Sequence, residues 1–253
     1  MEMTRCRRNP ARANQRARGK SVLLRRKDGR TKATPPAVEP GIPLNEPVES
    51  LAVERLCDDL QIVRSLELEH RMAVHEAGHA VARLHLDIGT IVKITIEAPE
   101  GGYVAGTMPG PGEQTEEMLT GVLIAALAGR AAEEVIVGSV VAGSGSEGSD
   151  LASATALACE METTMGFSRR WPLLHRKVED RGAVFAVDHD LAERVHARLE
   201  SASTVARKMA VEHETTIDFL GDILMTRKTL EGEELEAVLE QVSVDFRREL
   251  TRD

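Results

Sequence analysis

The stretch HEAGH at residues 75–79 combines side chains that carry out hydrolysis together. Residues four apart on an α-helix lie about 40° apart around the axis, so His75 and His79 can both present a ring nitrogen to one ion. Neutral imidazoles suit zinc, which lowers the pKa of a bound water to about 7. Glu76 lies about 100° further round, where it can take a proton from that water. The motif therefore predicts a zinc-dependent hydrolase of peptide or amide bonds, with Glu76 as the general base.

The motif supplies only two protein ligands, so a third must come from elsewhere in the chain. His85 follows His79 by six residues, as in the metzincin pattern, but Ala82 stands where that pattern has a helix-breaking glycine. In an unbroken helix His85 lies about 120° away from His79. We therefore expect His85 to point off the metal face.

Three acidic residues are the remaining candidates for the third ligand. Glu133 and Glu134 follow Arg130 at a predicted helix end, where they are as easily ion-paired or solvated. Asp150 ends a Gly/Ser loop and opens a predicted helix, so fixed backbone can aim its short side chain. The same position also suits a capping or first-turn acid that stabilises the helix dipole. The residues alone leave both roles of Asp150 open.

Helices must position these side chains, because the composition favours helix packing. Aromatic residues make up 2% of the 253 residues and hydrophobic residues 42%, so the core consists of Ala, Leu, Val, Ile and Met. Apolar residues recur at helical spacing from Val48 to Leu86, and HEAGH lies inside the last helix of this region. Further helices are predicted at about residues 115–132, 150–165, 191–212 and 215–225, and in GEELEAVLEQV from residue 232.

The hydrophobic period changes after the HEAGH helix. Ile91, Val92, Ile94 and Ile96 form a β-branched run, and residues 102–108 follow a Glu-Gly-Gly turn as its hairpin partner. We therefore expect a mostly α (α+β) fold, with a small β-hairpin or sheet beside the HEAGH helix.

The first 36 residues form a basic arm. They contain twelve Lys or Arg against two acidic residues, a net charge of +10, which leaves −19 for the rest of a chain whose total is −9. The segment TPPAVEPGIPLNEP at residues 34–47 holds five of the ten prolines and cannot continue a helix. We expect residues 1–45 to be a disordered arm and linker, and residues 46–253 to fold. The arm could also bind nucleic acid or an anionic lipid surface, or act as a transit peptide.

Cysteine usage and hydropathy indicate the compartment. The three cysteines, Cys6, Cys57 and Cys159, are odd in number and share no CxxC spacing, which argues against disulfides and a thiolate metal site. No run approaches the roughly 18 apolar residues that a membrane-spanning helix needs. We therefore expect a soluble, cytoplasmic protein.

Longer stretches around these motifs resemble a known family. In order and spacing, HEAGHA, LAGRAAEEVIVG and GSEGSDLASATALACEMETTMGFS resemble the peptidase domain of the FtsH-type ATP-dependent zinc metalloproteases, and DILMTRKTLEGEEL fits as well. The likeness covers about Leu66 to Val242. It implies a helical zincin-type peptidase domain whose zinc ligands are His75, His79 and Asp150, with Glu76 as the base.

The resemblance also implies partners. That family joins its peptidase domain to a membrane anchor and an AAA+ ATPase, and its peptidase domains form hexameric rings. The residues before Leu66 are too few for an ATPase, and GKS at residues 19–21 lacks the upstream glycine of a phosphate loop, where Asn14 stands. We expect a zinc metalloendopeptidase that cuts peptides or unfolded polypeptide, bound as an extra strand beside the 91–108 hairpin or delivered by a separate AAA+ ATPase ring.

A second hypothesis belongs to another class of protein. A catalytically idle chain could keep the peptidase fold and use its basic arm to bind nucleic acid or an acidic partner. The intact HEAGH motif and Asp150 favour the enzyme.

Overall fold

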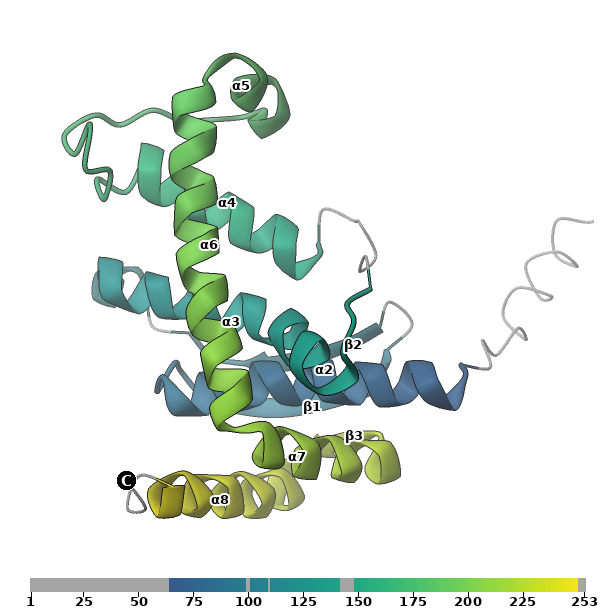
Figure 1. Cartoon of the computed structure of the whole chain (residues 1–253). Coiled ribbons are helices and arrows are strands. Elements are labelled where there is room, and N and C mark those ends of the chain that lie inside the picture. The colour runs from purple at the N-terminus through teal and green to yellow at the C-terminus, as the bar shows by residue number, and fades with distance from the viewer. Residues whose placement is uncertain (1–63, 99–100, 109, 142–147, 250–253) are drawn as a thin grey trace, which may run out of the picture. The chain divides into compact units, whose positions relative to one another are not determined.

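The computed structural model describes residues 64–249, apart from residues 99–100, 109 and 142–147 (Figure 1). The basic arm, the boundary predicted at residue 45, the GKS stretch and the start of the first predicted helical region lie outside the described residues. The described part is mostly helical and contains a small antiparallel sheet, which confirms the predicted fold class.

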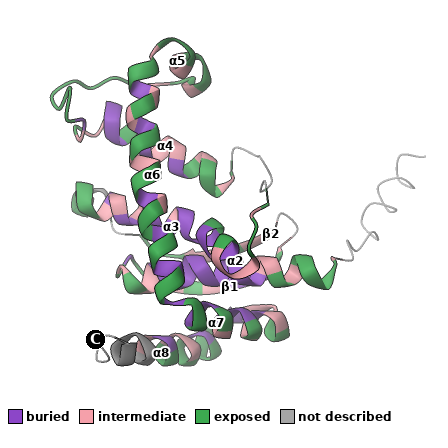
Figure 2. Cartoon of the chain, viewed as in Figure 1, coloured by how far each residue is buried: buried purple, intermediate pink, exposed green. Residues whose placement is uncertain are grey.

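Helix α2 (Leu66–His85) carries the HEAGH motif in its second half. Its first turn is capped by the Ser65 hydroxyl, which accepts a hydrogen bond from the backbone N–H of Leu68. The chain leaves the helix through Asp87, whose φ of 52° lies in the left-handed region. From Ala73 to Ala82 nearly every residue is buried, so the motif lies in the core of the fold (Figure 2).

The sheet has the order β2-β1-β3, with β1 (Ile91–Ala98) antiparallel to both neighbours. Strand β2 (Gly101–Gly106) completes the predicted hairpin, whereas β3 (Thr229–Glu231) was not predicted. Ile94 pairs with Val104 on one side and with Leu230 on the other. In the sheet that the described residues form, β3 is therefore one edge strand and β2 the other.

Helix α3 (Glu116–Ala132) packs closely against α2. A Cβ atom at Gly78, inside the HEAGH motif, would lie 2.7 Å from the Cβ atom of Ala132 and 2.8 Å from the carbonyl oxygen of Ala128. Small residues on both helices therefore allow their backbones to approach. Helix α3 continues into a π-helical turn, η2 (Glu133–Val137), which ends at the left-handed Gly138.

The remaining helices are α4 (Asp150–Thr163), α5 (Arg181–Val187), α6 (His189–Glu212), α7 (Glu214–Arg227) and α8 (Gly232–Glu249). All except α5 were predicted, with bounds that differ by a few residues; α5 has only seven residues and none of them is buried. Figure 1 shows the long α6 passing α4 and α3, both of which it contacts, before the chain turns into α7. A short 3-10 turn, η1 (Pro111–Glu113), precedes α3.

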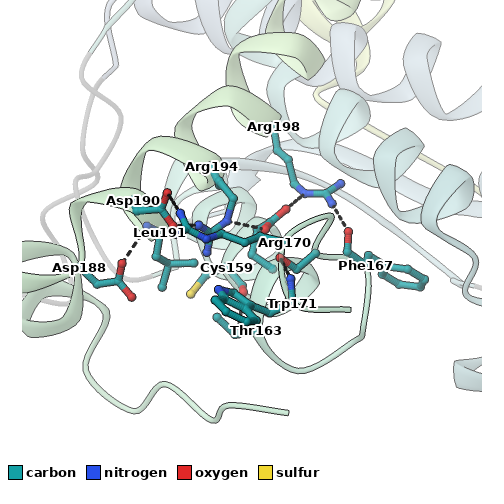
Figure 3. A network of polar contacts seen from close by, with 12 residues as sticks. Cys159, Thr163, Phe167, Arg170, Trp171, Asp188, Asp190, Leu191, Arg194 and Arg198 are labelled. Atoms are coloured by element: carbon teal, nitrogen blue, oxygen red, sulfur yellow. Dashed lines mark hydrogen bonds and ion pairs between the residues drawn. The ribbon is translucent and has the colours of Figure 1, made fainter. Parts of the chain in front are cut away.

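An ion network fastens the C-terminal half of α4 to its neighbours (Figure 3). The buried Glu162 accepts hydrogen bonds from Arg194 Nε at 2.9 Å and Arg198 Nε at 2.5 Å, both on α6. Arg198 also pairs with Glu116 of α3. Glu162 is buried and accepts from both arginines, so its loss would leave two cations without their partner. The network therefore holds in place the helix whose first residue is Asp150.

Among the helices in the described part of the chain, none is both long enough and apolar enough to span a membrane.

Candidate functional site

The two histidines of HEAGH point their ring nitrogens at one place. His75 Nε2 and His79 Nε2 lie 3.0 Å apart, and Asp150 Oδ2 lies 3.0 Å from the first and 3.3 Å from the second. Two ligands on a tetrahedral zinc at about 2.0–2.1 Å lie roughly 3.3 Å apart. The three atoms therefore have the spacing of ligands around one ion, although Asp150 comes from α4, far along the chain.

The opposite ring nitrogens decide what this cluster can bind. His79 Nδ1 donates to the carbonyl oxygen of Ala125 at 2.7 Å, and His75 Nδ1 donates to Glu133 Oε1 at 2.7 Å. Each neutral ring therefore turns the lone pair of Nε2 toward the other ring and toward the Asp150 carboxylate. The three groups converge on one point where a cation must lie, either a proton on Nε2 in the metal-free protein or a metal ion, and N and O ligands at this spacing fit zinc.

The pKa values of His75 and Asp150 also show that the cluster favours a positive charge between these side chains. Burial alone would lower the pKa of His75, but hydrogen bonds to Asp150 and Glu133 outweigh it and raise that pKa to about 10, so without a metal ion His75 carries a second proton, which zinc would displace. Burial would raise the pKa of Asp150, yet hydrogen bonds from His75 and His79 hold it well below its usual range. Asp150 is therefore a carboxylate at neutral pH.

Glu76 lies beside the cluster and against the sheet. Its side chain is buried, and a Cβ atom at Gly102 of β2 would lie 2.5 Å from Glu76 Oε1. Burial raises the pKa of Glu76, while the charges of His79 and His75 lower it in part. A carboxyl group of raised pKa, next to this cluster and an edge strand, is well suited to move a proton.

One stripe of α3 and its extension supports both histidines. Ala125, Gly129 and Glu133 are spaced four residues apart and face α2. The carbonyl oxygen of Ala125 accepts from His79, and Glu133 accepts from His75. Between them, a Cβ atom at Gly129 would lie 2.6 Å from the Nε2 atoms of both histidines. The missing side chain at Gly129 is therefore what leaves room for the two rings.

The other third-ligand candidates lie outside the cluster. His85 contacts His213, with 2.9 Å between His85 Nδ1 and His213 Nε2. Glu134 forms a two-oxygen ion pair with Arg207, at 2.7 Å for each oxygen. Glu133 contacts Nδ1 of His75 rather than Nε2, the nitrogen that faces His79 and Asp150.

Two features of the site were missed from the sequence. Glu133 was considered only as a ligand, an ion-paired or a solvated residue, and Arg71, which donates to Glu133 at 3.0 Å, was not considered. The spacing in the sequence could have indicated Arg71, because it precedes His75 by one helical turn and therefore lies on the same face of the helix.

The comparison with known families agrees with this geometry. The model of peptidase family M41 matches residues 63–238 of the chain, which include every described residue of the cluster. The chain belongs to peptidase family M41.

Three curated proteins similar to this chain are named as ATP-dependent zinc metalloproteases. The chain is 31% identical over 204 residues to the ATP-dependent zinc metalloprotease FtsH 1 of Sorangium cellulosum, covering 74% of this chain and 32% of the relative. It is 32% identical to the ATP-dependent zinc metalloprotease FtsH of Akkermansia muciniphila, covering 70% of this chain and 24% of the relative. With the chloroplastic FTSH 6 of Arabidopsis thaliana the identity is 31%, over 67% of this chain and 27% of the relative. The chain thus spans 24% to 32% of the length of these relatives.

Proposed function

We propose that this chain is a zinc-dependent metalloendopeptidase, with His75, His79 and Asp150 as the zinc ligands and Glu76 as the general base. The observation that carries the proposal is the convergence of three lone-pair donors, whose spacing suits a tetrahedral ion. Membership of family M41 and the names of the relatives support zinc and proteolysis.

Bound zinc would supply Lewis-acid chemistry, which polarises a carbonyl and acidifies water. The residues of the chain do the rest. Glu76, buried at the side of the cluster, accepts the proton of the attacking water and can return it to the leaving amide nitrogen. Glu133 and the carbonyl oxygen of Ala125 accept from Nδ1 of the two imidazoles, so that Nε2 is the nitrogen left to bind a metal once its proton is displaced.

The substrate we propose is an extended polypeptide that pairs with β2. This strand is an edge of the sheet, and its Gly102 lies directly against Glu76. Backbone hydrogen bonds from an edge strand hold a peptide irrespective of its sequence, which suits a protease of unfolded chains. Folded substrates cannot offer such a strand, so we propose that they first require unfolding by an AAA+ ATPase.

Metal analysis and cleavage assays test the proposal. The purified chain should hold about one zinc and cleave unfolded casein without ATP, and a chelator should abolish both. Glu76→Gln should retain zinc but lose roughly a hundredfold to ten-thousandfold in rate, the usual contribution of a positioned base. Zinc binding without cleavage would instead favour the catalytically idle interaction protein. A chain that binds no zinc would refute both the metal site and the peptidase.

A further inference from the structure

Arg71 makes contacts that join two parts of the site. From one turn before His75, its Nη1 atom donates to Glu133 Oε2 at 3.0 Å and to the carbonyl oxygen of Ser139 at 2.5 Å. Its Nη2 atom donates to Ser139 Oγ at 3.0 Å. The side chains of Arg71 and Glu133 are only 11% and 4% exposed, so this ion pair is shielded from water.

Glu133 connects these contacts to a proposed zinc ligand. Its Oε1 atom accepts from His75 Nδ1, and its Oε2 atom accepts from both Arg71 and the backbone N–H of Val141, the latter at 3.2 Å. One carboxylate therefore orients the imidazole on one side and holds the backbone after η2 on the other.

The backbone that Arg71 and Glu133 hold lies directly after η2. After η2 the left-handed Gly138 turns the chain, so that Ser139 and Val141 pass beside Arg71 and Glu133. Ser139 and Val141 are thus held by the same pair of side chains that orients His75.

We propose that Arg71 is a positioning residue, which fixes Glu133 against His75 Nδ1 and so aligns His75 for zinc. This inference rests on the proposed function, because it takes His75 as a zinc ligand. A planar guanidinium can bind a carboxylate and a backbone segment at once, which the single ammonium of lysine cannot do with the same geometry. Ligands that are already aligned bind an ion without the cost of ordering them.

Zinc affinity of the full-length chain tests the role of Arg71. The protein is titrated with Zn²⁺ in competition with a chromophoric chelator, in the wild type and in Arg71→Met. We expect Arg71→Met to bind zinc about 10- to 100-fold more weakly, the usual effect of losing a group that orients a ligand. Arg207→Met is the matched control, because it breaks an arginine ion pair with the adjacent Glu134, which touches no proposed ligand. Its zinc affinity should equal that of the wild type.

Two further measurements separate positioning from a general loss of stability. The visible spectrum of the Co²⁺-loaded protein reports the arrangement of ligands, so Arg71→Met should change it and Arg207→Met should not. Arg71→Lys keeps the charge and preserves the fold, and it should recover only part of the zinc affinity. If Arg71→Met does not fold, an affinity of Arg71→Lys at least threefold below the wild type still supports the inference.

The inference is overturned if folded Arg71→Met binds zinc as tightly as the wild type. If Arg71→Met does not fold, a zinc affinity of Arg71→Lys within threefold of the wild type overturns it. Either result leaves the proposed function standing. A wild-type chain that binds no zinc would overturn both.

Discussion

Gly129→Ala is a small change at the centre of the site. The added methyl group would lie 2.6 Å from the Nε2 atoms of both His75 and His79, whereas carbon and nitrogen atoms in contact normally lie about 3.5 Å apart. The two rings, or helix α3 itself, would have to move by up to about 0.9 Å. The helical backbone at this position otherwise favours alanine over glycine by about 0.8–1 kcal/mol. Intrinsic helix propensity therefore favours alanine at position 129, whereas the space around the two histidine rings disfavours it.

The magnitude follows from the cost of overpacking. Inserting a methyl group into a packed site costs about 1–3 kcal/mol, and this strain falls on the atoms proposed to face zinc. If it appears fully in metal binding, zinc affinity falls about 5- to 150-fold, since about 1.4 kcal/mol corresponds to a factor of ten. Chelator competition measures the affinity, and cleavage of unfolded casein at limiting zinc should fall in parallel.

Gly121→Ala in the same helix is the control. Its added methyl group would lie 3.0 Å from Ile88 Cδ1, the end of a flexible side chain, and reaches no proposed ligand. We expect Gly121→Ala to bind zinc as the wild type does. A Gly129→Ala protein whose zinc affinity lies within twofold of that of Gly121→Ala would refute the reasoning, because the rings would then have room that the structure does not give them.

Other expected outcomes concern the third ligand and the arm. Asp150→Ala should remove zinc and activity together, as measured by metal analysis and casein cleavage, whereas a merely helix-terminal acid would cost only about 0.5–2 kcal/mol of stability. His85→Ala and Glu134→Ala should both retain zinc, and loss of zinc in either of them with retention in Asp150→Ala would contradict the ligand assignment. Deletion of residues 1–45 should leave a folded, zinc-binding peptidase, as checked by circular dichroism and metal content. A truncated chain that fails to fold would show that the domain begins earlier.

Local patterns in the sequence were sufficient for most elements of the fold. The helical spacing of apolar residues predicted α2, α3, α4, α6, α7 and α8, and the β-branched run from Ile91 predicted the hairpin. These patterns work because each element buries one face, and the period of that face is set by the backbone geometry. The seven residues of α5 contribute no buried side chain, so there was no such pattern to read. Strand β3 has only three residues, and it is defined by its pairing with the distant β1.

Some features of the site could likewise be predicted from local spacing, and others depend on tertiary packing. The spacing of His75 and His79 was sufficient to predict that both nitrogens face one point, because that spacing is a property of a single helix. The position of Asp150 between a loop and a helix was equally compatible with a metal ligand and a helix cap, and the resemblance to a family favoured the ligand. Only the packing of α4 against α3 and α6 brings its carboxylate within 3.0 Å of His75.

The support of the site depended wholly on tertiary structure. Glu133 orients His75, Arg71 binds both Glu133 and Ser139, and Gly129 leaves room for the two rings. Each role depends on which face of α3 packs against α2 and on the distance between the two helices. The spacing of residues along a single helix does not specify this packing. The sequence by itself determined the type of chemistry, through one helix that carries the histidines and Glu76. The tertiary structure decided which distant residues complete and align the site, because they meet only when the helices pack.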